Sequence, residues 1–120
     1  DNINLLGKVA ITQLLSTDGA EYKRQLCAYL HETTRQVVEK LGSVEGLVPM
    51  QPEATFLVWC DFRAKGDWQT VSKRLIEEAN VALSGGTFFG PAGEGWFRIN
   101  CGHSRAQLLP AVDRICRVFA

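Results

Sequence analysis

The stretch LSGGTFFGPAGEGWFRINCGHSR, residues 83–105, decides the fold predicted for this chain. Its first half is rich in glycine, which is typical of a flexible loop followed by a turn. The next five residues, WFRIN at 96–100, alternate in polarity and predict a short strand. On such a strand Phe97 and Ile99 point to one side, whereas Arg98 points to the other.

Arg98 is the most informative residue of this strand because of its chemistry. A guanidinium carries a planar fork of donors that can hold a carboxylate through two hydrogen bonds at once. The alternative is a side chain on a solvated face or in a structural ion pair, and surface pairs of that kind contribute little to stability. The residue types alone leave both interpretations open.

Two helices are expected before the strands. Apolar residues in 4–15 recur at helical spacing and predict a short amphipathic helix whose apolar side needs a partner. Asp18 and Glu21 form a D-x-x-E capping box, which predicts that a long helix begins there. Gly42 is a natural stop for that helix.

Three further strands are expected, and all of them precede the strand at 96–100. Residues 47–50 predict an edge strand, because Pro49 cannot donate a hydrogen bond to a sheet. The nearly continuous apolar run 55–62 is typical of a strand covered on both faces. A short strand over 81–83 is predicted to lead into the glycine-rich loop.

Two more helices complete the prediction. Asp67 is expected to cap a helix that buries Trp68, Val71, Leu75 and Ala79. A last helix is expected to begin at Ser104, with Pro110 weakening it beyond its first turn. Its predicted buried residues are Leu108, Val112, Ile115, Cys116 and Phe119.

The predicted order of elements is thus α, α, β, β, α, β, β, α, within one domain. We expect an α+β fold: a small mixed or antiparallel sheet of about three to four strands, with helices packed mainly on one face. The chain has 120 residues, a length that suits a single hydrophobic core.

Composition narrows the classes of partner and compartment. Thirteen basic residues balance 13 acidic ones, which argues against nucleic acid as a partner. No apolar run approaches the roughly 20 residues that a membrane span needs. The four cysteines and two histidines show no metal-binding spacing, so no metal site is predicted. Reduced thiols in a cytoplasmic protein fit this pattern best.

Other motifs give weaker predictions. The glycine-rich loop lacks the phosphate-binding pattern G-x-x-x-x-G-K-[ST]. His31 is expected on a helix surface and His103 in a loop, and none of the lysines has the apolar shield that would suit it to covalent catalysis. The sequence begins at Asp1 and its only methionine is Met50, so we expect a fragment or a processed product.

Two segments carry a resemblance to a known family. PEATFLVWCDFR at 52–63 and VALSGGTFFGPAGEGWFRINCGHSRAQL at 81–108 closely resemble the C-terminal part of fold-type I pyridoxal-phosphate (PLP) enzymes. Within that group the chain is most similar to the cystathionine β-lyase-like, or C–S lyase, branch of the class I/II aminotransferases. The resemblance covers nearly the whole chain, and the P-E-A-T and G-x-G-W-F-R-I-N motifs are its most specific parts.

The resemblance implies roles for particular residues. Arg98 matches the family arginine that holds the α-carboxylate of an amino acid substrate. Gly86, Thr87 and Phe88 match a mobile loop near the substrate, although Thr87 stands where members commonly have Ser. Arg105 matches an arginine that opens the last helix, with a structural role.

The resemblance also implies what this stretch does not contain. The cofactor is PLP, and its lysine, phosphate-holding residues and ring-stacking tyrosine all lie upstream in the family. No catalytic and no cofactor-binding residue is therefore expected here, and the fragment alone is predicted to be inactive. Residues 1–17 would be a lead-in helix from the junction with the large domain, and 18–120 the C-terminal small domain.

The parent protein is accordingly expected to be an enzyme that acts on an amino acid. In the parent, this chain would contact a large domain and a homodimer partner. Two alternatives stay open at this point. One is a free-standing α+β module that binds a small carboxylate or regulates another protein. The other is an interaction domain without a small ligand, whose exposed first helix would favour self-association.

Overall fold

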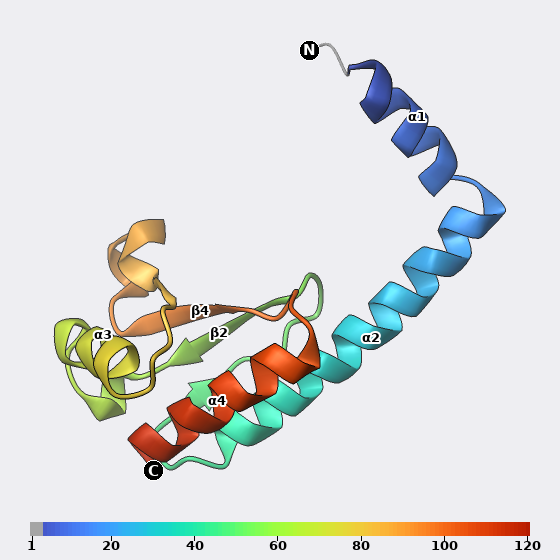
Figure 1. Ribbon diagram of the computed structural model, residues 1–120. Helices are drawn as coiled ribbons and strands as arrows, with labels where there is room; N and C mark the ends of the chain where they lie inside the picture. The colour runs from blue at the N-terminus through green and yellow to red at the C-terminus, as the bar shows by residue number, and fades with distance from the viewer. Residues whose placement is uncertain (1–3) are drawn as a thin grey trace.

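The computed structural model describes residues 4–120 and confirms the predicted order of elements (Figure 1). Three short 3-10 helices lie between the main elements and are labelled η1 (Arg63–Lys65), η2 (Gly86–Phe89) and η3 (Pro91–Gly93). The main elements, in chain order, are α1 (Leu5–Leu14), α2 (Thr17–Gly42), β1 (Val48–Pro49), β2 (Leu57–Asp61), α3 (Trp68–Glu77), β3 (Ser84–Gly85), β4 (Trp96–Asn100) and α4 (Arg105–Phe119).

The strands form one antiparallel sheet in the order β1-β2-β4-β3, with α2 and α4 packed side by side against one face (Figure 1). This is the α+β arrangement expected from the sequence. β1 lies at an edge, as Pro49 requires. The central pair is β2 and β4, in which Trp59 lies opposite Arg98 and Cys60 opposite Phe97.

Burial alternates along both central strands. Val58 and Cys60 on β2 and Phe97 and Ile99 on β4 are buried beneath the helices. Their neighbours point to the other side of the sheet, here called the open face and made up of Leu57, Trp59 and Asp61 on β2 and Trp96, Arg98 and Asn100 on β4. The prediction that the strand at 55–62 is covered on both faces is therefore wrong for the described residues: helices cover only one face.

Three other local predictions are wrong. α2 is capped by Ser16 rather than by Asp18, because the Ser16 hydroxyl accepts a hydrogen bond from the Gly19 amide. Trp68 is 37% exposed, since it lies in the first turn of α3 beside a surface hollow. The strand predicted at 81–83 begins only at Ser84, because the chain just before it is still hydrogen-bonded to the end of α3.

The other helix predictions are confirmed. Asp67 accepts a hydrogen bond from the Thr70 amide and caps α3. Ser104 is the N-cap residue of α4, which continues through Pro110. The apolar residues predicted for α4 are buried, except for the half-buried Cys116. Burial raises the pKa of the Cys60 thiol to about 12, which keeps it protonated.

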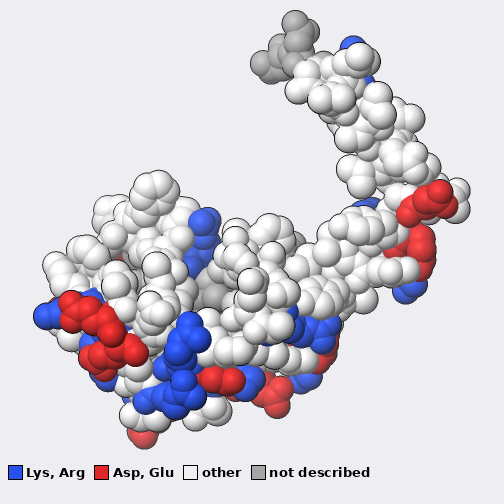
Figure 2. Space-filling model, in the orientation of Figure 1, with Lys and Arg blue, Asp and Glu red and all other residues white. Residues whose placement is uncertain are grey.

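α1 and the first half of α2 form an arm that extends away from the sheet (Figure 1). The predicted helix at 4–15 is present, but no residue of α1 is buried; Leu5 and Leu6, for example, are 76% and 82% exposed. Figure 2 shows that the surface of α1 is almost free of charge. Within the described residues, no helix combines the length and the hydropathy that crossing a membrane would require.

Phe62 links the sheet to α4 and offers a test of this core. It is fully buried, and its ring meets those of Phe97 and Phe119 edge to face, with centroids 5.3 and 5.4 Å away. Phe62→Ala should lower the free energy of unfolding by about 3–5 kcal/mol. Chemical denaturation measures this change. Tyr22→Ala, at a side chain that is 60% exposed, is the control and should change it by less than about 0.5 kcal/mol; equal effects would contradict the assigned core.

Candidate functional site

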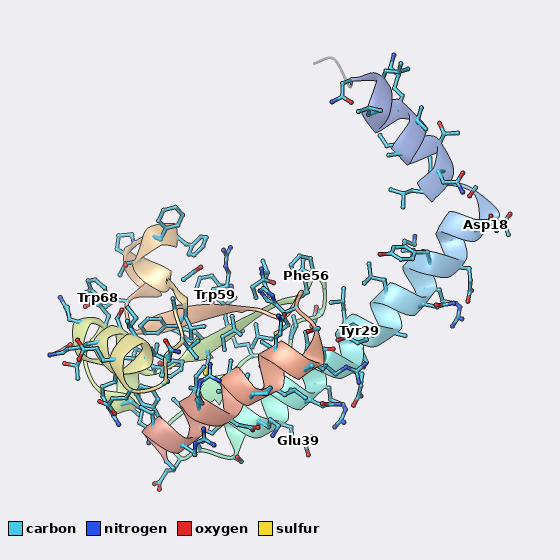
Figure 3. All side chains as sticks on the ribbon, viewed as in Figure 1. Asp18, Tyr29, Glu39, Phe56, Trp59 and Trp68 are labelled. Carbon is cyan, nitrogen blue, oxygen red and sulfur yellow. The ribbon has the colours of Figure 1, made fainter. Side chains whose placement is uncertain are left out.

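Arg98 lies at the centre of the open face. It occupies the middle position of β4, between Trp59 on β2 and Ser84 on β3. Its side chain is half-buried, and the central carbon of its guanidinium lies 4.5 Å from the centre of the Phe89 ring. Figure 3 shows Trp59 on the side of the sheet away from α2 and α4, which is the side that carries Arg98. Arg98 is thus stacked on an aromatic ring.

No carboxylate among residues 4–120 lies within 4.0 Å of the Arg98 guanidinium. The ion pair that the sequence allowed as an alternative is therefore not formed inside the described part of the chain. A cavity of about 400 Å³ lies on the α4 side of the sheet edge, between the segment 81–84, the end of β4 and α4. Arg98, Asn100 and His103 line it together with mostly apolar side chains.

A second arginine provides a contrast at the far end of the open face. Arg63 donates from Nε to both carboxylate oxygens of Asp61 at 3.0 Å, and from its terminal nitrogen to one of them at 2.7 Å. These hydrogen bonds hold the pKa of Asp61 below its usual range. Arg63 is thereby neutralised and is already bound, whereas the donors of Arg98 face no acid within residues 4–120.

Phe89 is the site residue that the sequence analysis missed. Its ring lies edge-on to Trp59, with the centroids 5.2 Å apart, and it also meets Phe88 at 5.2 Å. Phe88 itself is 88% exposed, so Phe89 rather than Phe88 reaches back to the sheet. A signal was present in the sequence, because two successive aromatic residues follow the paired glycines, but it does not say which ring turns inward.

The loop predicted as flexible forms a short strand and two 3-10 helices, η2 and η3. Gly86 is buried where two backbone segments meet: a Cβ atom placed there would lie 2.1 Å from the carbonyl oxygen of Gly93. Gly90 and Gly95 have φ angles of 134° and 77°, the positive values expected of glycine in turns. Thr87 and Phe88 are exposed, and their closeness to a substrate stays a prediction.

The remaining candidates take structural or surface positions. His31 is exposed on α2. Arg105 opens α4 as expected: its amide donates to the Tyr29 hydroxyl at 2.8 Å, and its guanidinium lies 4.2 Å from the centre of the Tyr29 ring. Within residues 4–120 no cluster of three or more His, Cys, Asp or Glu side chains is placed to hold a metal.

The lysines of the described chain do not fit a PLP site beside Arg98. Lys40 donates to Asp113 at 2.6 Å on the opposite side of the sheet, between α2 and α4. Lys73 lies next to Glu77 on α3, and no lysine lines the cavity that adjoins Arg98. Lys40 and Lys73 are therefore engaged with acidic partners on helices rather than with the open face.

Comparison with known proteins gives matches over most of the chain. The model for "Aminotransferase class I and II" matches residues 4–115. Cystathionine beta-lyase PatB of Bacillus subtilis is 31% identical over 99 residues, which cover 81% of this chain and 26% of that protein. An LL-diaminopimelate aminotransferase of Desulforudis audaxviator is 32% identical over 92 residues, which cover 77% of this chain and 23% of that protein.

Solved structures show the same fold. A PLP-bound protein from Clostridium difficile 630 is 28% identical and superimposes with a TM-score of 0.80, covering 85% of this chain and 27% of its own. Like the matches to curated relatives, this one covers only about a quarter of the known protein's length. These proteins differ in their named reactions but share the architecture that carries β4.

The contact between Gly86 and Gly93 generates a prediction. Gly86→Ala should force the backbone segments apart and lower the free energy of unfolding by about 1–3 kcal/mol. Thermal or chemical denaturation measures the loss. Gly85→Ala is the matched control, because a Cβ atom there meets nothing closer than 4.0 Å. If both variants are equally stable, the two backbone segments do not lie as close as the structure places them.

The ion pair between Asp61 and Arg63 predicts a pH dependence. The pKa of Asp61 is lowered on folding, so its stabilising contribution is present above the unfolded value of about 3.9 and is lost as the pH falls through the folded value. Asp61→Asn should therefore be less stable than the wild type at pH 7, and the gap should shrink towards pH 2. Glu45→Gln, at a carboxylate without an ion pair within residues 4–120, is the control in the same denaturation series and should destabilise the protein less than Asp61→Asn at pH 7.

Proposed function

This chain belongs to the class I and II aminotransferase family, and we propose that it binds the α-carboxylate of an amino acid substrate through Arg98 in a PLP-dependent aminotransferase or C–S lyase. The observation that carries the proposal is the state of Arg98. Its guanidinium is held on the open face of the sheet, and no acid within residues 4–120 pairs with it.

The geometry suits carboxylate binding for an electrostatic reason. A half-buried guanidinium is less solvated than a fully exposed one, and a charge-assisted hydrogen bond to it is correspondingly stronger. An ionised α-carboxylate is planar and matches the two parallel N–H donors of an arginine.

PLP supplies the electron sink for reactions at the α-carbon of an amino acid. In this proposal the cofactor is held by another part of the parent protein, because the cofactor lysine of the family lies upstream of the region that this chain matches. The part played by this chain is to orient the substrate: two bonds to its carboxylate fix the position of the α-carbon. Residues 18–120 then act as the small domain of the enzyme and 1–17 as the segment that joins it to a larger one.

The proposed substrate is an amino acid, and the proposed reaction is either transamination or cleavage of a C–S bond. The relatives include a cystathionine β-lyase and an aminotransferase, and the names of both imply an amino acid substrate. The α-carboxylate is common to all such substrates, so its recognition by Arg98 serves either reaction. A large domain and a second subunit, which the family resemblance implies, are part of the same proposal.

Substitution of Arg98 tests the proposal in the protein at the full length that its gene encodes, supplied with PLP. Arg98→Lys keeps the charge but loses the planar fork, so it should mainly raise KM for the amino acid and lower kcat/KM by about 10- to 100-fold. Steady-state kinetics measure this. Arg63→Lys is the control, because Arg63 is bound to Asp61 and should leave the kinetics within about twofold of the wild type. Unchanged kinetics in Arg98→Lys would remove Arg98 from the site.

A further inference from the structure

We propose that Phe89 is the positioning residue of Arg98: its ring fixes the guanidinium from one face and leaves the N–H donors free for a carboxylate. This inference rests on the proposed function and deepens it, because it names a residue that acts on the substrate only through Arg98. The observation behind it is the position of the central guanidinium carbon over the Phe89 ring, at 4.5 Å from the ring centre.

The edge of a guanidinium donates hydrogen bonds, whereas its two flat faces can contact aromatic rings. The N–H donors all lie in the guanidinium plane and point outward from its edge, whereas attraction to an aromatic ring acts through the flat face. A carboxylate therefore approaches in the plane, where the ring does not compete with it. Phe89 can restrict the movement of Arg98 without using any of the hydrogen bonds that a substrate needs.

The second arginine near this face, Arg63, is held by a carboxylate instead of an aromatic ring. Arg63 is held by Asp61, whose two carboxylate oxygens accept from both Nε and a terminal nitrogen. That arrangement uses the donors which a second carboxylate would require. An acidic neighbour would fix Arg98 equally well but would close it to a ligand, so an aromatic neighbour is the one that keeps a binding arginine both ordered and available.

Phe89 is 48% exposed and has contacts of its own on the open face. Its ring is nearly perpendicular to that of Trp59, the residue directly across the sheet from Arg98, so Phe89 contacts two neighbouring side chains of the open face. The 3-10 helix that carries Phe89 is folded back by the close approach of Gly86 to Gly93. The contact between the two glycines thus places η2, η2 places the Phe89 ring, and the ring contacts the guanidinium of Arg98.

Substitution of Phe89 in the full-length protein with PLP gives the test. Phe89→Leu keeps an apolar side chain but loses the ring, and should raise KM for the amino acid by about 3- to 30-fold with kcat changed less than about twofold. Phe89→Tyr keeps the aromatic face and should restore the wild-type KM. A second readout is the affinity for propionate, a carboxylate without an amino group, measured by titration calorimetry. This affinity should fall in Phe89→Leu by a factor similar to the rise in KM, and should be unchanged in Phe89→Tyr.

A double-mutant cycle with Arg98→Gln separates positioning from general stability. If Phe89 acts through Arg98, adding Phe89→Leu to Arg98→Gln changes neither KM nor the affinity for propionate any further. An equal loss in both backgrounds would show a merely structural role and overturn the inference. So would wild-type KM in Phe89→Leu while Arg98→Gln is impaired, an outcome that leaves the proposed function standing. No effect of Arg98→Gln on either readout would defeat the proposed function and, with it, the role of Phe89.

Discussion

Alternation along β4 is the constraint on which the rest of the structure depends. Phe97 and Ile99 must be buried against α2 and α4, and this burial fixes the direction of every other side chain on the strand. Arg98 is carried to the opposite face as a consequence. A shift of one residue in register would bury the guanidinium without a partner, at a cost that no neighbouring contact could offset. The core and the candidate site are therefore two sides of the same strand.

The open face is ordered by aromatic contacts rather than by charge. Trp59, lying across from Arg98, meets the edge of Phe89, and Phe89 in turn supports the guanidinium. The glycines of the preceding loop matter because they let two backbone segments approach closely, and less because they are flexible. A loop of this kind can place a ring with the accuracy that substrate orientation requires.

The helical layer connects this face to the arm. The Tyr29 hydroxyl on α2 accepts a hydrogen bond from the Arg105 amide, and the Tyr29 ring lies against the Arg105 guanidinium. These contacts connect the start of α4 to the middle of the long helix. Beyond that point α2 and α1 leave the sheet, and the apolar side chains of α1 are exposed. This uncovered surface agrees with a chain that spans about a quarter of the length of the curated relatives it matches.

The sequence by itself determined the order of elements, the capping of α3 by Asp67 and the side of β4 on which Arg98 lies, because each depends on residues close together in the chain. Its family motifs also identified Arg98 as the candidate for carboxylate binding. Only the tertiary structure decided that one face of the sheet stays open, that Gly86 contacts Gly93, and that Phe89 rather than Phe88 turns towards Arg98. These features depend on how separate segments pack in space, and a local pattern of polarity carries no information about the distance between them.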